Sequence, residues 1–352
     1  MTLFLGLASF FVILAVLILV HELGHFTMAK LFRVRVNEFG LGFPPRLKSW
    51  RRGGTVYSLN AIPLGGFVKM LGENGEDLEP DSFGAKPQWQ RLIVLCAGPC
   101  MNLLLAVFIA FVAFSVGSPR GLTIITSVSP RSPAAAAGLQ VNDRIVAVNG
   151  HAVKYLSDLQ TVIDRDVSNH PGEWVSIRVH RGATTLNTQL IPRVHPPKDQ
   201  GPMGIVLSRT VTISYPPVVA LRRSLQEVGT MIGSIPLLIQ SLSQHNGASL
   251  SGPIGIAHVT TDAVHAEPTN GIGSIFQLMA ILSAGLGVLN LLPFPALDGG
   301  RLVFVLISWI RRRNLSPEIE GIVHLAGMAV LLMLIMVISY NDLIKWITGA
   351  GY

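Results

Sequence analysis

The sequence predicts an α-helical integral membrane protein with four transmembrane helices, a membrane-associated β-hairpin loop on the cytoplasmic side and one extracytoplasmic α+β domain. Its composition is the first reason: 49% of the 352 residues are hydrophobic and 13% are charged, whereas soluble domains carry about 25% charged residues. The apolar residues also collect in long runs of the length that crosses a bilayer. Finally, ionisable residues that suit a metal site stand at the end of the first run.

Charge and cysteine usage agree with this class. A net charge of +7 would also suit a nucleic-acid partner, but Lys and Arg are spread between the apolar runs, as membrane topology requires. Cys96 and Cys100 lie one helical turn apart in an apolar run, which suits packing better than a disulfide. The N-terminus lacks a basic region and a small-residue cleavage site, so we expect a retained span and not a signal peptide.

The order of apolar and polar segments predicts the topology. The loop after the first span is rich in Lys and Arg and is therefore expected inside. After one more crossing, a stretch of alternating β-branched residues must be extracytoplasmic. A segment before the third span is expected to be amphipathic and to lie against the membrane. In chain order the predicted boundaries are the first span 1–31, the loop 32–90, the second span 91–117, the α+β domain 119–208, the amphipathic segment 216–270, the third span 272–310 and the fourth span 320–345.

The inside loop has a β-hairpin pattern. Val34 to Phe39 and Thr55 to Leu59 alternate apolar and polar side chains, and Gly53-Gly54 precedes the second run. The stretch that follows, Ile62 to Met70, is more apolar than a cytosolic loop needs to be. Such a sheet could dip into the membrane beside the metal site, and its free edge could pair with an extended peptide. An ordinary surface hairpin is the alternative.

His21, Glu22 and His25 form the motif on which the functional hypothesis depends. On a helix, His21 and His25 share one face, so both can bind one Zn²⁺, and Glu22 can polarise a zinc-bound water. Charged residues are expensive within a membrane span unless a site uses them. A soluble metalloprotease helix, or two histidines at the membrane interface, are the alternatives.

A catalytic zinc usually has a third protein ligand, and Asp298 is the candidate. It follows Pro293 and Pro295, which should break the third span, and Gly299-Gly300 should let its carboxylate turn inward. Its alternative role is a helix cap. If residues 228–243 crossed the membrane, Asp298 would lie on the opposite side from the histidines, which favours four spans. His324 in the fourth span suits an interfacial residue better than a ligand.

Together these motifs resemble the site-2 protease family of zinc intramembrane metalloproteases, specifically its bacterial branch with a PDZ domain. His21-Glu22-Leu23-Gly24-His25 resembles the family's His-Glu-x-x-His, and Asn290 to Gly299 resembles its Asn-x-x-Pro-x-x-x-x-Asp-Gly. Gly98-Pro99-x-x-Asn102 matches the motif of the second span, and Leu64 to Met70 resembles the end of the membrane-associated β-loop. The resemblance covers nearly the whole chain.

The resemblance implies site residues. The zinc ligands would be His21, His25 and Asp298, the catalytic base Glu22, and the substrate-binding residues Asn290, Asn102, Gly65 and Gly66. It also implies one PDZ domain at about residues 121–207, which would bind a peptide terminus or act as a size filter.

The implied function is cleavage of transmembrane segments of single-span proteins that another protease has already trimmed, such as anti-sigma factors or remnant signal peptides. The bilayer is the other implied partner, and no nucleic acid is expected. The implied location is the bacterial inner membrane, with both termini and the PDZ domain outside and the zinc site near the cytoplasmic side. A non-catalytic PDZ-bearing membrane scaffold and a zinc transporter are the competing hypotheses.

Overall fold

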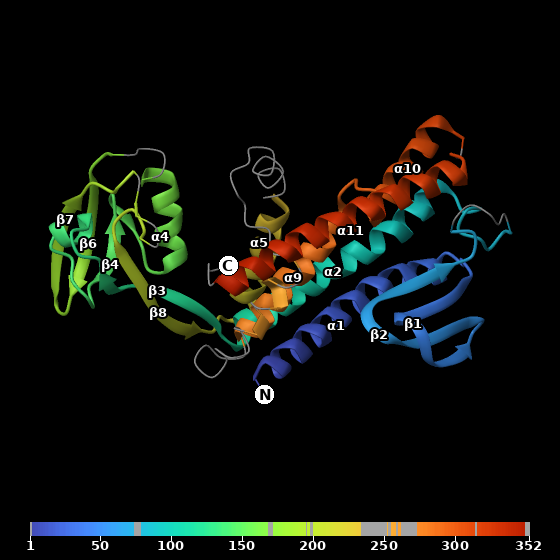
Figure 1. Ribbon diagram of the computed structural model, residues 1–352, viewed down its shortest axis with the longest axis horizontal. Helices are drawn as coiled ribbons and strands as arrows, with labels where there is room; N and C mark the ends of the chain where they lie inside the picture. The colour runs from blue at the N-terminus through green and yellow to red at the C-terminus, as the bar shows by residue number, and fades with distance from the viewer. Residues whose placement is uncertain are drawn as a thin grey trace. The chain divides into compact units, whose positions relative to one another are not determined.

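The computed structural model describes residues 2–73, 79–167, 172–194, 196–197, 200–233, 252, 255–257, 260–261, 273–313 and 315–348. The chain forms two units (Figure 1). One unit combines Met1–Val116 with Tyr215–Tyr352, and the other is Gly117–Ser214.

Helices dominate the first unit. Their bounds are α1 Thr2–Leu31, α2 Gln88–Val116, α5 Pro217–Gly233, α9 Gly273–Leu291, α10 Asp298–Arg311 and α11 Pro317–Thr348. Among the described residues, four helices are long and apolar enough to cross a membrane: Ala8–Leu31, Gln88–Val116, Gly273–Leu291 and Pro317–Ile344. The four predicted spans are confirmed in this sense, by length and composition.

Small residues allow α2 to pack closely on its neighbours. Ala106, Ala110 and Ala113 are buried on α2, and Ala280 and Ala284 are buried on α9. Small side chains let helix backbones approach where lipid offers no hydrophobic drive. Helix α2 begins at Gln88, so Pro99 lies in the interior of the helix.

The third span is broken as predicted, and α10 follows the break. It starts at Asp298 itself, and Leu297 occupies the N-cap position. The alternative role of Asp298 as a helix cap is therefore wrong. Gly299 is needed for space rather than for an unusual turn, because a Cβ there would collide with the carbonyl oxygen of Leu292.

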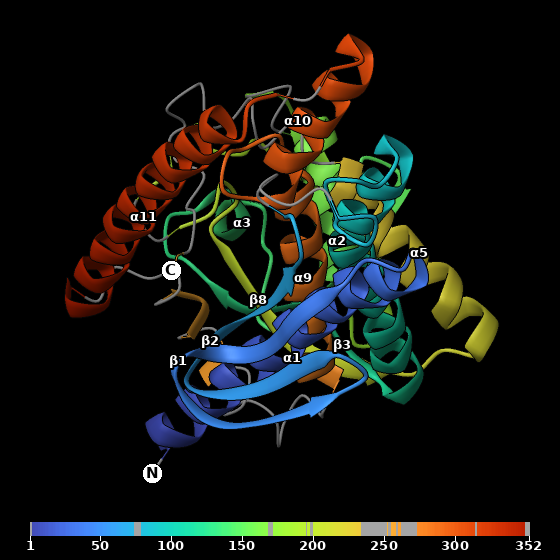
Figure 2. The same cartoon turned by 90° about the vertical axis from the view of Figure 1, so that its right-hand side faces the viewer.

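The predicted hairpin is present as β1 (Val36–Arg52) and β2 (Thr55–Met70), which lie against α1 (Figure 2). The turn residues Gly53 and Gly54 both have positive φ, 57° and 81°, which is the geometry of a tight hairpin turn. The strands bend, so that four segments lie in the order 46–52, 55–60, 36–41 and 66–70. In the described part of the chain, no strand pairs with the outer edge of segment 66–70.

Helix α5 is amphipathic, as expected for the start of segment 216–270. Its residues Ala220, Ser224 and Val228 are buried, and α5 packs on α2. On other faces Val218 and Leu225 are exposed. Residues 234–243, the end of the stretch considered for a crossing, lie outside the described residues, and membrane association of this segment stays a prediction.

The second unit contains a six-stranded sheet in the order β7-β6-β4-β3-β8, with β5 paired to β4. Buried and exposed residues alternate along β6, which points its apolar side chains into one core. The unit extends a few residues beyond the predicted 119–208. Its elements are β3 Ser118–Val128, α3 Pro133–Ala136, β4 Arg144–Val148, β5 His151–Ala152, α4 Leu156–Val162, the π-helical turn Ile163–Val167, β6 Val175–Arg181, β7 Thr184–Leu190 and β8 Ile205–Ile213.

An ion pair between Asp143 and Arg181 should make the second unit sensitive to acid. Arg181 donates to both carboxylate oxygens of Asp143 over 2.7 Å, and the Asp143 side chain is fully buried. These hydrogen bonds hold the pKa of Asp143 below its ordinary value of 3.8. The stabilisation is therefore present above that pH and is lost as the pH falls through the lowered pKa.

We expect Asp143→Asn to destabilise this unit by about 2 kcal/mol at neutral pH and to remove much of its acid sensitivity. Pulse proteolysis of the full-length protein, followed at sites within residues 117–214, measures both effects. Equal stability of the variant and the wild type at pH 7 would contradict the expectation.

Candidate active site

The two histidines of the motif lie on one face of α1, turned toward α2. His21 and His25 are 7% and 6% exposed, and their rings meet edge to face. The Nδ1 atom of His25 donates to the carbonyl oxygen of Val94 on α2 over 2.8 Å. Gly98 makes this approach possible, because a Cβ at that position would collide with His25 Nε2.

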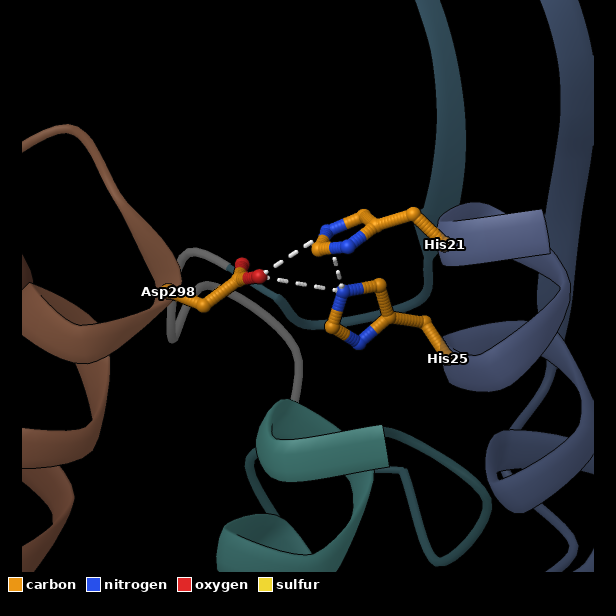
Figure 3. A group of neighbouring side chains, drawn as sticks. All are labelled: His21, His25 and Asp298. Atoms are coloured by element: carbon orange, nitrogen blue, oxygen red, sulfur yellow. Dashed lines mark hydrogen bonds and ion pairs between the residues drawn. The ribbon is translucent and has the colours of Figure 1, made fainter. Parts of the chain in front are cut away.

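Asp298 completes the group from a distant part of the chain. Figure 3 shows its carboxylate pointing at both imidazoles from the start of α10. Its Oδ2 atom lies 3.0 Å from His21 Nε2 and 3.2 Å from His25 Nε2, and the two Nε2 atoms are 3.2 Å apart. The side chains that the sequence predicted to share one site therefore do so.

These three atoms suit a zinc ion. Because Nδ1 of His25 carries the proton given to Val94, its Nε2 in the neutral ring has only a lone pair, and a carboxylate offers only lone pairs. Such atoms repel each other unless a cation or protons lie between them. Zinc at about 2.05 Å from each of its ligands in a tetrahedron would separate them by about 3.3 Å. The separations of 3.0–3.2 Å are close to that value.

Glu22 lies beside the metal group at a cavity of about 160 Å³. The outer strand segment 66–70 forms another wall, and a Cβ on Gly66 would lie 3.0 Å from the Glu22 Cγ atom. The Glu22 side chain thus lies next to the proposed zinc ligands and next to strand segment 66–70. The cavity is lined by Glu22, His25, Gly66, Phe67, Val68, Met70, Glu73, Leu95, Asp298 and Arg301.

Glu73 and Arg301 are two residues that sequence reasoning did not assign to the site. Arg301 donates to the Glu73 carboxylate, which also accepts the backbone N–H of Met70 over 3.2 Å. This joins the end of β2 to the helix that carries Asp298. Arg301 follows Asp298 by three positions, the spacing of one helix face, which was an available signal.

The predicted substrate-binding residues have varied surroundings. Asn102 is fully buried, and its amide nitrogen lies 3.3 Å from His21 Nδ1. Asn290 donates to the carbonyl of Leu286 within α9. Gly66 lines the cavity, whereas Gly65 is buried with φ 133°. Substrate contacts of these residues stay predictions, but the contact of Asn102 with His21 suggests a role in orienting a ligand.

Comparison with known proteins identifies the family. The model of peptidase family M50 matches residues 9–334. The chain belongs to peptidase family M50. A protein of Clostridium acetobutylicum that is named as a zinc metalloprotease is 33% identical over 94% of each chain. The zinc metalloprotease RasP of Geobacillus kaustophilus is 28% identical over 97% of this chain and 98% of its own.

The M50 match, together with these relatives named as zinc metalloproteases, confirms the predicted class of enzyme, a zinc metalloprotease, and its cofactor, zinc. A solved PDZ domain of an SdrC-like protein from Listeria monocytogenes is 27% identical over 25% of this chain and 87% of its own. Its TM-score of 0.21 is too low to support an argument. The PDZ assignment of the second unit therefore stays a prediction.

Proposed function

We propose that this M50 protein is an intramembrane endopeptidase that cleaves a peptide bond within the transmembrane segment of single-span proteins. The observation that supports this most directly is the meeting of His21 and His25, on a helix of membrane-spanning length, with Asp298 from α10. These three residues are the proposed zinc ligands. Glu22, at the adjoining cavity, is the proposed general base.

Zinc bound there supplies a Lewis acid that lowers the pKa of a water molecule and polarises a carbonyl group. Glu22 accepts the proton of the attacking water and then passes it to the leaving amine. Val94 holds the proton on Nδ1 of His25, which leaves Nε2 available as a ligand. Asn102 can do the same for His21 if its amide turns by 180°, so that its oxygen accepts the Nδ1 proton.

The substrate must unwind before it can be cut, because each carbonyl of a transmembrane helix is hydrogen-bonded within that helix. Segment 66–70, whose outer edge pairs with no other strand among the described residues, lines the cavity and can pair with an extended peptide. This pairing would satisfy the backbone groups that unwinding exposes. It also places the peptide beside Glu22.

Hydrogen–deuterium exchange tests this pairing. With a single-span substrate bound to full-length Glu22→Gln protein, the outward-facing amides of segment 66–70 should exchange at least about tenfold more slowly. Segment 55–60 lies between two other segments and serves as the internal control. Unchanged exchange in segment 66–70 under saturating substrate would exclude it as the docking edge.

The proposed substrates are single-span proteins already trimmed by another protease, with anti-sigma factors and remnant signal peptides as examples. The proposed location is the bacterial inner membrane, with both termini and the second unit outside and the zinc site near the cytoplasmic side. The second unit, as a PDZ domain, would bind a new peptide terminus or act as a size filter.

Mass spectrometry of products tests the proposed function. The purified full-length enzyme, in detergent or proteoliposomes, should cut a trimmed single-span substrate inside its apolar segment. Cleavage only in the flanking polar regions would contradict intramembrane cleavage. Zinc flux without any proteolysis would favour the zinc transporter, and binding without either would favour the scaffold.

A further inference from the structure

His324 on α11 contacts the loop that leads to Asp298. Its Nδ1 atom lies 3.0 Å from the backbone nitrogen of Ala296. A backbone N–H can only donate, so Nδ1 accepts this hydrogen bond and the ring proton is on Nε2. His324 thus reaches a residue two positions before Asp298, a proposed zinc ligand.

Ala296 has an unusual backbone conformation. Its φ is 78°, in the left-handed region that residues with a Cβ adopt only where their surroundings hold them. This residue ends the proline-containing break, and α10 begins two residues later at Asp298. The direction in which the Asp298 side chain points therefore depends on Ala296 keeping this conformation.

The packing of α11 supports the same contact. A Cβ on Gly327, one turn after His324, would collide with Pro295, so the helix lies directly on the loop. The ring of Phe304, from α10, lies 5.5 Å from the His324 ring. A cavity lined by Ala296, Asp298, Arg301 and His324 among others borders this contact. His324 is thus held between the loop and α10.

We propose that His324 is a positioning residue of the metal site: by accepting the Ala296 N–H, it holds the loop in the conformation that directs the Asp298 carboxylate at His21 and His25. It acts through the backbone and not as a ligand. The inference rests on the proposed role of Asp298 as a zinc ligand. It predicts that zinc binding weakens when residue 324 loses its hydrogen-bond acceptor. Zinc binding should stay close to wild type when the imidazole ring is replaced by a side chain that keeps an acceptor at the same place.

The test compares His324→Asn with His324→Leu in the full-length protein. The Asn side-chain oxygen stands where Nδ1 stands and can accept the same hydrogen bond, whereas Leu has a similar shape and no acceptor. The measurement is the fraction of zinc retained during titration with a chelator. His324→Leu should lose zinc at about tenfold lower chelator concentration, by analogy with other partners that orient metal ligands, and His324→Asn should stay close to wild type.

Equal zinc loss in both variants would show a packing role and overturn the proposal, as would wild-type retention in His324→Leu. If His324→Leu does not give a folded protein by gel filtration, His324→Gln replaces it, because its oxygen lies beyond the Nδ1 position. Asp298→Ala is measured alongside. Wild-type zinc retention in that variant would contradict the proposed function itself, whereas zinc loss there with no effect at His324 overturns only this inference.

A second comparison uses Ala296→Gly. Glycine adopts the left-handed conformation without steric cost, so the loop should need His324 less. In the Ala296→Gly background, His324→Leu should shift the chelator midpoint by less than threefold. An undiminished tenfold shift in that background would overturn the role assigned to the Ala296 conformation.

Discussion

Glu22→Gln is expected to reduce peptide-bond cleavage by about 10²- to 10⁴-fold while zinc stays bound, because the amide cannot accept the proton of the attacking water. Glu22 lines the cavity beside His25 and Asp298, but it is not one of the three residues that form the candidate metal group. Loss of proton transfer without loss of metal is therefore the signature of this role. Cleavage of a single-span substrate and zinc content by atomic absorption are the two measurements.

Glu318→Gln is the matched control, because Glu318 lies exposed in the first turn of α11. It should leave cleavage unchanged. If Glu22→Gln lost zinc together with activity, Glu22 would act as a ligand. If it kept full activity, another group would be the base.

Gly98→Ala is expected to weaken zinc binding and cleavage by about ten- to a hundredfold. A Cβ at this position would collide with His25 Nε2, a proposed ligand atom, and the hydrogen bond from His25 Nδ1 to the Val94 carbonyl holds the ring against α2. Added methyl groups in packed interiors cost about 1–3 kcal/mol, and about 1.4 kcal/mol corresponds to tenfold in affinity. At Gly98 this free-energy cost should appear as weaker zinc binding, because the added methyl group displaces a proposed ligand. Titration with a chelator measures the change in zinc affinity.

Gly285→Ala provides the control on α9, because nothing lies within 4 Å of a Cβ added there. Alanine also has the higher helix propensity. This variant should bind zinc and cleave substrate as the wild type does. If Gly98→Ala behaved like Gly285→Ala, the close contact beneath His25 would not matter for the site.

Much of the site could be predicted because its signals are local. His21 and His25 are one helical turn apart, and Glu22 is beside them, so a helix alone brings them together. Asp298 could be found because a membrane makes a carboxylate after a proline break unusual and because catalytic zinc needs a third ligand. The Gly53-Gly54 turn predicted the hairpin for the same local reason.

The remaining features depend on contacts between distant segments. Nothing near Glu73 in the sequence indicates that it pairs with Arg301. His324 looked like an isolated polar residue in an apolar helix, and its partner is a backbone N–H of the loop between α9 and α10. The left-handed conformation of Ala296 was equally hidden, because alanine gives no signal for it.

X-ray absorption spectroscopy at the zinc edge tests the central claim most directly. In the full-length, zinc-loaded enzyme we expect one zinc bound by two imidazole nitrogens and by oxygen at about 2.0–2.2 Å, with no sulfur. Asp298→Ala, which should bind zinc more weakly, is measured at saturating zinc, where its oxygen shell should change and both imidazoles should remain. A sulfur shell at about 2.3 Å, or fewer than two imidazoles in the wild type, would contradict a site built from His21, His25 and Asp298.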